Sequence, residues 1–219
     1  MVKILMVVTN QSEIKTGKAT GIWLSEFAEA YQAFSKQGYE VVVASPLGGE
    51  APVDPVSVDA NTPKEIWDLQ KHLSNTVSLD EVSESQFDAI FLPGGHGTMF
   101  DLPNNGKLQQ LLRHFYESNK IVAAVCHGPA GLVGANLSNG EPLVAGKRVN
   151  AFTNLEEEQT GLRPDLPFLL ESKIRELGAI YVAAPNWTSH VEIDGNLITG
   201  QNPQSTIAVA EAVIKKIGR

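Results

Sequence analysis

The sequence has a single cysteine, a shortage of basic residues and no long apolar run. With Cys126 alone among 219 residues no internal disulfide can form, which suits a reducing cytoplasm and predicts a cytoplasmic location. The 17 basic residues are outnumbered by 25 acidic ones, and no basic stripe interrupts the chain, so we expect no nucleic-acid partner. No window approaches about 18 consecutive apolar residues. We therefore expect no transmembrane helix and no membrane partner.

Signals for bound metals and for export are also missing. The sequence holds no pair of cysteines at metal-binding spacing, no HExxH motif and no EF-hand loop, so we assign no metal ligand. The first ten residues contain one lysine and lack a small-residue cleavage site, which favours a first strand over a signal peptide. The length suits one α/β domain that covers residues 1–219.

Short apolar runs, typical of buried strands, alternate with segments that show helical spacing. We predict helices at 21–37, 64–73, 107–118, 168–177 and 204–217, and strands at 2–8, 39–45, 87–92, 121–125, 180–183 and within 146–153, with a hairpin at 191–198. This alternation predicts a flavodoxin-like α/β fold, a three-layer sandwich with a mostly parallel sheet between helices. In such sheets the ligand crevice lies beyond the carboxyl ends of the strands.

The stretch 121–132, IVAAVCHGPAGL, carries the strongest chemical signal of the chain. Its apolar first half predicts a buried strand, and Gly128 with Pro129 predicts a helix directly afterwards. Cys126 then lies on a sharp strand-to-helix turn, the nucleophile elbow that exposes a catalytic side chain. A helix N-terminus beside it would favour the thiolate. The alternative is a small buried apolar residue, the commonest setting of a lone cysteine.

A glycine-rich loop follows the strand predicted at 87–92, in the sequence PGGHG. Backbone N–H groups of Gly94 and Gly95 are unobstructed by side chains and could stabilise an oxyanion. The residue after the nucleophile, His127, could offer a second N–H. We expect His96 to line the same pocket. The alternative is an ordinary glycine turn.

Glu26 is a candidate acid because it falls between Trp23 and Phe27 on a partly apolar helix surface. Most helical glutamates are solvated. If Glu26 is buried near Cys126, its pKa is raised and the neutral acid can hydrogen-bond the thiolate. The sequence leaves open whether Trp23 and Trp187 line the site or pack elsewhere in the protein.

Three further acids follow the segment Phe152-Thr153-Asn154. Glu156, Glu157 and Glu158 have the position of a first helical turn, for which Asn154 is a suitable cap. One of them could orient the imidazole of His127, and the residues alone do not decide which.

Five motifs in order give the chain a resemblance over nearly its whole length. It is similar to the PfpI superfamily of class I glutamine amidotransferase-like folds, and closest to its glyoxalase III and heat-shock chaperone-like branch. The matching segments are GIWLSE (21–26), FDAIFLPGGHG (87–97), AVCHGPAGL (124–132), AFTNLEEE (151–158) and LITGQNPQS (197–205).

The resemblance implies roles for the candidates. By this resemblance Cys126 is the nucleophile and His127 is its acid/base partner. Glu26 would form a hydrogen bond with the cysteine. Glu157 would complete a triad, with Glu156 or an acid from another subunit as the alternative. The loop 93–97 would supply an oxyanion N–H from Gly95.

The resemblance also implies an activity: the cofactor-free conversion of methylglyoxal and water to D-lactate, or related deglycase or hydrolase chemistry on small reactive carbonyls. The enzyme class would be a glyoxalase III-type lyase (D-lactate dehydratase), with a stress-response role and a homodimeric assembly.

Other functions compete with this one. A glutamine amidotransferase would pair Cys126 with a distant His-x-Glu, and His190-Val191-Glu192 has that form. A peptidase would also use the cysteine. A non-enzymatic stress chaperone or a redox sensor would need only a reactive thiol or an exposed apolar patch.

Overall fold

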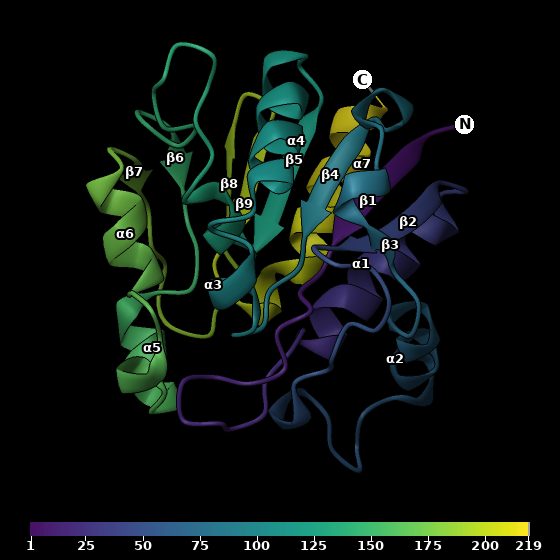
Figure 1. Cartoon of the computed structure of the whole chain (residues 1–219), viewed down its shortest axis with the longest axis vertical. Coiled ribbons are helices and arrows are strands. Elements are labelled where there is room, and N and C mark those ends of the chain that lie inside the picture. The colour runs from purple at the N-terminus through teal and green to yellow at the C-terminus, as the bar shows by residue number, and fades with distance from the viewer. Residues whose placement is uncertain (219) are drawn as a thin grey trace.

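Residues 1–218, which the computed structural model describes, form a mixed seven-stranded sheet (Figure 1). In spatial order its strands are β3 (Val77–Ser78), β2 (Glu40–Ser45), β1 (Lys3–Val7), β4 (Ala89–Leu92), β5 (Ile121–Val125), β9 (Leu197–Gly200) and β8 (Val191–Asp194). All neighbours pair in parallel except β8, which forms an antiparallel hairpin with β9. The order β2-β1-β4-β5-β9 is that of flavodoxin. The predicted fold class is confirmed.

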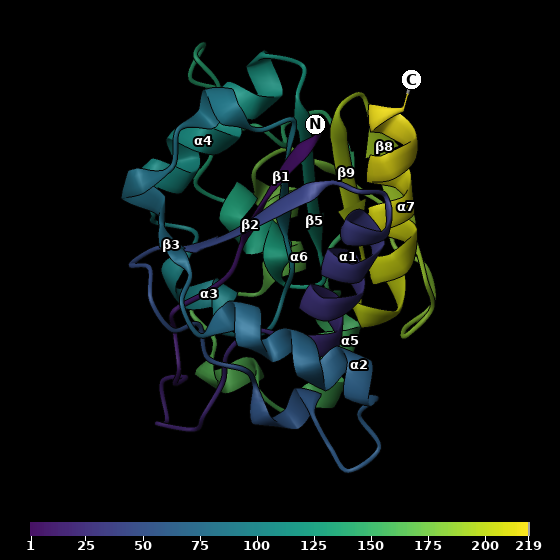
Figure 2. The same cartoon turned by 90° about the vertical axis from the view of Figure 1, so that its right-hand side faces the viewer.

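Helices cover both faces of this sheet. The α-helices of the described chain are α1 (Leu24–Lys36), α2 (Lys64–Trp67), α3 (Thr98–Asp101), α4 (Gly106–Glu117), α5 (Asn154–Thr160), α6 (Leu170–Glu176) and α7 (Thr206–Ile217). Figure 2 shows α1 and α7 on one side of the strands and α4 on the other. A second, two-stranded parallel sheet joins β6 (Arg148–Val149) to β7 (Ile180–Tyr181).

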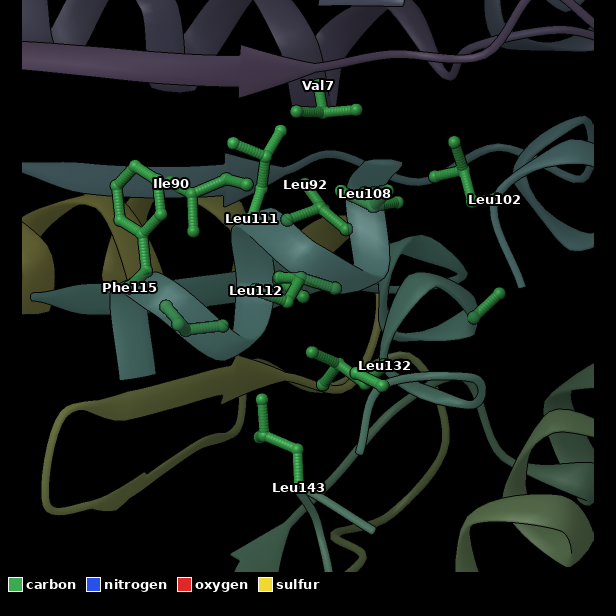
Figure 3. Close-up of a cluster of buried hydrophobic side chains, with 14 of the residues drawn as sticks. Val7, Ile90, Leu92, Leu102, Leu108, Leu111, Leu112, Phe115, Leu132 and Leu143 are labelled. Atoms are coloured by element: carbon green, nitrogen blue, oxygen red, sulfur yellow. The ribbon is translucent and has the colours of Figure 1, made fainter. Parts of the chain in front are cut away.

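The apolar run of β5 is explained by burial on both of its faces. All five of its residues are buried, and alternate side chains enter two separate cores. Val122 and Ala124 join the core under α4, where Leu111, Leu112 and Phe115 pack (Figure 3). Truncating one such leucine to alanine typically costs about 2–5 kcal/mol. The well-packed sheet therefore holds the loops that follow the carboxyl ends of its strands in fixed positions.

The sheet order reverses between β1 and β4, and this switch point directs the loops. The chain leaves β1 toward β2 on one side, and it leaves β4 toward β5 on the other. A crevice opens at such a point beyond the carboxyl ends of the strands. The long loop after β1 reaches across this end to α5 and its following turn (Figure 1), where Lys15 Nζ donates to Leu166 O at 2.8 Å.

Several predicted elements differ from the observed ones in length or type. The helix expected after Cys126 is a 3-10 turn over Gly128–Leu132, because Gly128 packs directly against the carbonyl of Leu92 and two glycines weaken an α-helix there. The helix expected at 64–73 stops being α-helical after Trp67. Two short elements, β3 and α3, were missed because neither has enough residues to show a period.

Membrane insertion by a helix finds no support in the described part of the chain. No helix within residues 1–218 combines the length and the apolar character that a membrane crossing requires.

Candidate active site

Cys126 directly follows β5, in a backbone conformation that few non-glycine residues adopt. Its φ is +59°, in the left-handed region, and its side chain is only 3% exposed. Such a conformation costs on the order of 1–3 kcal/mol and persists only where the surroundings enforce it. Here the Cys126 N–H donates to Gly200 O at 3.0 Å, and its carbonyl accepts from Phe152 N at 2.9 Å. The strand-to-turn geometry is that of a nucleophile elbow.

His127 connects the cysteine to a carboxylate. The distance from Cys126 Sγ to His127 Nδ1 is 3.4 Å, and His127 Nε2 lies 2.6 Å from Glu157 Oε2. The other oxygen of Glu157 lies 2.8 Å from His96 Nε2 and also accepts from Thr160 Oγ1 at 2.8 Å. One chain therefore supplies a Cys–His–Glu arrangement with a second histidine on the same carboxylate.

The charges of this arrangement fix the imidazole tautomer. Burial by itself raises the pKa of Glu157, but His127 and His96 outweigh it and hold that pKa well below its usual range. Burial lowers the pKa of His127, and the neighbouring His96 lowers it further. A neutral His127 that donates from Nε2 to a carboxylate leaves Nδ1 unprotonated and facing the thiol. It can therefore accept the thiol proton.

Glu156, the alternative acid, has a different position. The N-cap of α5 is Thr153 rather than the predicted Asn154, and Thr153 and Glu156 form a capping box. The remaining oxygen of Glu156 accepts from Trp187 N at 2.8 Å and from Asn202 Nδ2 at 2.9 Å. Glu156 thus fastens two distant segments to α5, whereas Glu157, one residue later, faces His127.

Glu26 is fully buried in the first turn of α1, where sequence alone left burial and solvation open. Its Oε2 accepts a 2.6 Å hydrogen bond from Gly94 N, and its Oε1 has no oxygen or nitrogen partner among residues 1–218. Burial raises the pKa of Glu26 from 4.5 to about 8, and the thiol of Cys126 lies within hydrogen-bonding reach of the carboxyl group. Glu26 is therefore a neutral acid at pH 7.

The thiolate expected from a helix N-terminus is not favoured in this structure. Burial raises the pKa of the Cys126 thiol, and the neighbouring carboxyl group of Glu26 raises it further. The helix that was expected to oppose this effect is a short 3-10 segment, Gly128–Leu132, rather than an α-helix of several turns. Proton transfer to His127, rather than a resting thiolate, is the route to the nucleophile that this geometry offers.

The N–H groups of the glycine-rich loop 93–97 differ in whether they already have a hydrogen-bond acceptor. The N–H of Gly94 is occupied by Glu26, which removes Gly94 from the set of oxyanion donors. The N–H groups of Gly95 and His127 donate to no oxygen atom within the described chain. Gly95 has φ of +111°, and a Cβ there would lie 2.3 Å from Gly21 O, so no other residue fits. Its N–H and that of His127 are left as the candidate oxyanion donors.

A cavity of about 250 Å³ adjoins this group of residues. His96 forms part of its wall, together with Trp23 and Trp187, so both tryptophans left open by the sequence line it. A larger groove of about 700 Å³ lies elsewhere, beside Trp67 and Leu73, and contains none of the candidate site residues. The smaller cavity is the one that the chemistry can use.

His190 and Glu192 do not join the cysteine. His190 Nε2 lies 2.9 Å from Glu192 Oε1, and Glu192 also pairs with Arg148 at 3.0 Å. Along β8 Glu192 is buried and Ile193 is 55% exposed, the reverse of the usual pattern of a half-buried strand. The His-x-Glu of a glutamine amidotransferase is therefore committed to Arg148, while His127 occupies the position next to Cys126.

The donor atoms of His96, His127 and Glu157 lie within 4.8 Å of one another, which is also a geometry that metal sites use. The two hydrogen bonds between Glu157 and the imidazoles already account for their approach. We assign no metal to them.

Comparison with known proteins places the chain in a family. The sequence profile of the DJ-1/PfpI family matches residues 18–216, nearly the whole chain. The chain belongs to the DJ-1/PfpI family.

Two curated DJ-1/PfpI relatives and one solved structure extend this comparison. The chain is 33% identical to "Glyoxalase 3" of Candida albicans, with 98% of each chain covered. It is 34% identical to "Glutathione-independent glyoxalase hsp3101" of Schizosaccharomyces pombe, covering 91% of this chain and 88% of that one. The crystal structure of glyoxalase III from Candida albicans superimposes with a TM-score of 0.89 at 32% identity, covering 98% of this chain and 96% of that one.

Proposed function

We propose that the protein is a glutathione-independent glyoxalase that converts methylglyoxal and water to D-lactate. The observation that carries the proposal is the pair of proton carriers around one thiol. Glu26 holds a proton in complete burial on one side, and His127 with Glu157 accepts one on the other. A reaction that moves hydrogen between adjacent carbons needs both groups, whereas thioester hydrolysis alone needs one. The relatives named as glyoxalases support the same choice.

The first step is addition of the thiol to the aldehyde. His127 Nδ1 takes the proton of Cys126, and the sulfur attacks the aldehyde carbon, C1, forming a hemithioacetal. The carbonyl electrons move to oxygen, which accepts hydrogen bonds from the N–H groups of Gly95 and His127. His127 then returns its proton to this oxygen and is neutral again.

The second step transfers hydrogen from C1 to C2. His127 removes the C1 proton while Glu26 donates its own to the ketone oxygen on C2, which gives an enediol on the cysteine. Glu26 then takes the proton of the C1 hydroxyl as His127 protonates C2. The product is a lactoyl thioester, and both residues return to their starting protonation states.

The last step is hydrolysis of the thioester. His127 activates water, which attacks C1, and the sulfur of Cys126 leaves and recovers its proton. In the sum, C1 is oxidised from aldehyde to acid and C2 is reduced from ketone to alcohol. No external oxidant or reductant is consumed, so the reaction needs no redox cofactor.

The test is lactate formation from methylglyoxal in the absence of glutathione. The native protein is expected to produce D-lactate, and Cys126→Ala is expected to lose at least about 10³-fold of the rate. Ammonia release from glutamine, measured on the same preparations, tests the amidotransferase alternative, for which His190→Ala is the diagnostic variant. The absence of lactate from a folded native protein would reject the proposal.

We further propose that the enzyme is a cytoplasmic homodimer. The family resemblance supports the assembly, and the single cysteine supports the compartment. Light scattering of the purified protein tests the first proposal, and fractionation of the source cells tests the second.

A further inference from the structure

We propose that the cavity beside the triad selects 2-oxoaldehydes whose substituent is bulky and apolar or aromatic, in preference to the methyl group of methylglyoxal. This inference rests on the proposed glyoxalase function and specifies the substrate class of the same site. It concerns the wall of the cavity and not the reacting groups.

The wall of the cavity is mainly apolar, although its residues come from distant parts of the chain. Six apolar side chains line it: Ile14, Ala19, Trp23, Val56, Leu162 and Trp187. The side-chain oxygen atoms of Thr20, Asp54 and Thr160 on this wall already have hydrogen-bond partners. Thr20 Oγ1 donates to Asp54 Oδ2 at 2.9 Å, and Asp54 Oδ1 accepts from Val56 N at 2.9 Å. An entering group therefore meets carbon surface, with few free hydrogen-bonding groups to replace its water shell.

Charge also argues for an apolar occupant. Among residues 1–218, Lys18 is the one lysine or arginine that lines the cavity, and its side chain is exposed. A phosphate or a carboxylate is usually held by several charge-assisted hydrogen bonds, which one solvated ammonium group does not supply. Sugar-derived dicarbonyls would likewise leave their hydroxyl groups without partners against the indole rings.

The residues that line the cavity are connected to the catalytic groups by short chains of contacts. Trp23 N donates to Gly94 O at 3.0 Å, which fastens the backbone of this wall residue to the oxyanion loop. The ring of Trp187 meets that of Phe152 edge to face at 5.5 Å, and Phe152 packs on His127 at 4.4 Å. His96, which lines the cavity, has its ring 4.1 Å from that of His127, so a substituent in the cavity lies next to the groups that act on the aldehyde.

Trp187 is held in position at a conformational cost. Its φ is +60°, a strained value for a large side chain, and its N–H donates to the buried carboxylate of Glu156 at 2.8 Å. The side chain is nevertheless 40% exposed, so burial of the indole itself does not explain the strain. Contact with a ligand would explain it, because strain of this kind collects at ligand-binding positions.

The volume of the cavity exceeds what methylglyoxal needs. A water molecule occupies about 30 Å³ in the liquid, and the five non-hydrogen atoms of methylglyoxal fill roughly three such volumes. The cavity holds about 250 Å³. The remaining space accommodates a phenyl ring or a branched aliphatic group. Because each buried methylene changes kcat/KM by about 10-fold or more, filling this space should raise kcat/KM clearly.

The experiment compares phenylglyoxal, isopropylglyoxal and methylglyoxal as substrates of the native protein. We expect kcat/KM at least about 10-fold higher for the two larger aldehydes. Isopropylglyoxal is included because arylglyoxals also modify arginine side chains. Each reaction consumes one water and yields the 2-hydroxy acid, so product formation is measured in the same way for all three.

Two variants change the cavity without touching the reacting groups. Trp187→Ala removes a wall and Leu162→Trp fills the space, and both should lower the preference for the larger aldehydes toward one. Trp67→Ala is the matched control, because this tryptophan is 45% exposed but lines the separate groove. It should leave the preference unchanged. Thermal unfolding of each variant establishes that it is folded.

The outcomes separate this inference from the function on which it rests. Turnover of methylglyoxal with no preference for the larger aldehydes, or a preference that survives both cavity variants, overturns the inference alone. Turnover of none of the three aldehydes overturns the proposed function and the inference with it. Quenching of tryptophan fluorescence by D-mandelate, the product expected from phenylglyoxal, should weaken in Trp187→Ala and not in Trp67→Ala.

Discussion

Glu26 and Gly94 are joined by a 2.6 Å hydrogen bond that runs from the Gly94 N–H to Glu26 Oε2, with both groups buried. The bond holds the carboxyl group at the carboxyl end of the sheet, where its second oxygen has no oxygen or nitrogen partner within residues 1–218. A buried acid with an unoccupied oxygen next to a thiol is costly for folding. Its retention is explained if the proton is used in the reaction.

Replacing Glu26 by glutamine should stabilise the protein at neutral pH. Burial raises the pKa of Glu26 from 4.5 to about 8, so between these values the native state holds a proton that the unfolded state has released. The stability from this group is present below pH 4.5 and is lost as the pH rises toward 8, by about 1.4 kcal/mol per pH unit. The free energy of unfolding of Glu26→Gln, relative to native, should therefore increase over this range.

The control for this measurement is Glu65→Gln, at an exposed position in α2. Its difference from native should stay flat with pH. A flat difference for Glu26→Gln as well would mean that Glu26 is ionised in the native state, against the account.

Gly94→Ala should displace Glu26 and inactivate the enzyme. A Cβ at position 94 would lie 2.6 Å from His127 N and 2.8 Å from Glu26 Oε2. Such overpacking typically costs about 1–3 kcal/mol. We expect a lower melting temperature and at least a 10-fold loss in kcat, about 1.4 kcal/mol of transition-state stabilisation.

Gly106→Ala provides the comparison, since a Cβ there contacts nothing within 4 Å and the residue begins α4. It should be neutral or slightly stabilising. Native kinetics in Gly94→Ala would show that the position of Glu26 is unimportant.

Glu157→Gln should lower kcat/KM by about 10²–10⁴-fold, because an amide no longer fixes the imidazole tautomer or stabilises its protonated form. His127 and His96 hold the pKa of Glu157 well below its usual range, so its contribution to stability exists above the unfolded pKa and disappears as the pH falls. The variant should thus also unfold more easily at pH 7.

Glu158→Gln is the matched control on the same helix, where Glu158 is exposed and lies 3.4 Å from Arg163. Steady-state kinetics on both variants decide the assignment. Equal effects in the two would remove Glu157 from the triad.

The elements of the fold could be predicted because their causes are local. The five apolar residues of β5 and the helical spacing of Leu108, Leu111 and Phe115 record burial on known faces. The prediction of a helix that begins at Gly128 and Pro129 was wrong in type, because the observed 3-10 segment depends on the contact of Gly128 with Leu92. No local sequence pattern indicates that contact. Long-range packing overrides propensity in such cases.

Some features of the site could also be predicted from local sequence patterns, whereas others depend on long-range contacts. Cys126 and the glycine loop follow from strand ends, which a sequence displays. The position of Glu157 against His127 was given by resemblance, and the spacing alone did not separate it from Glu156. The prediction that the pKa of the Cys126 thiol is lowered was wrong. The shift depends on burial next to Glu26, which is 100 residues away in sequence. The strained backbone of Trp187 had no signal in the sequence.

The pH profile of methylglyoxal turnover shows whether protonated Glu26 takes part in the chemistry on Cys126. We expect the native kcat to fall above pH 8, where Glu26 loses the proton that burial retains. We expect Glu26→Gln to lose about 10²-fold or more of kcat at pH 7, although the variant is at least as stable as native. A Glu26→Gln protein with native kcat and the same decline above pH 8 would contradict this role of Glu26.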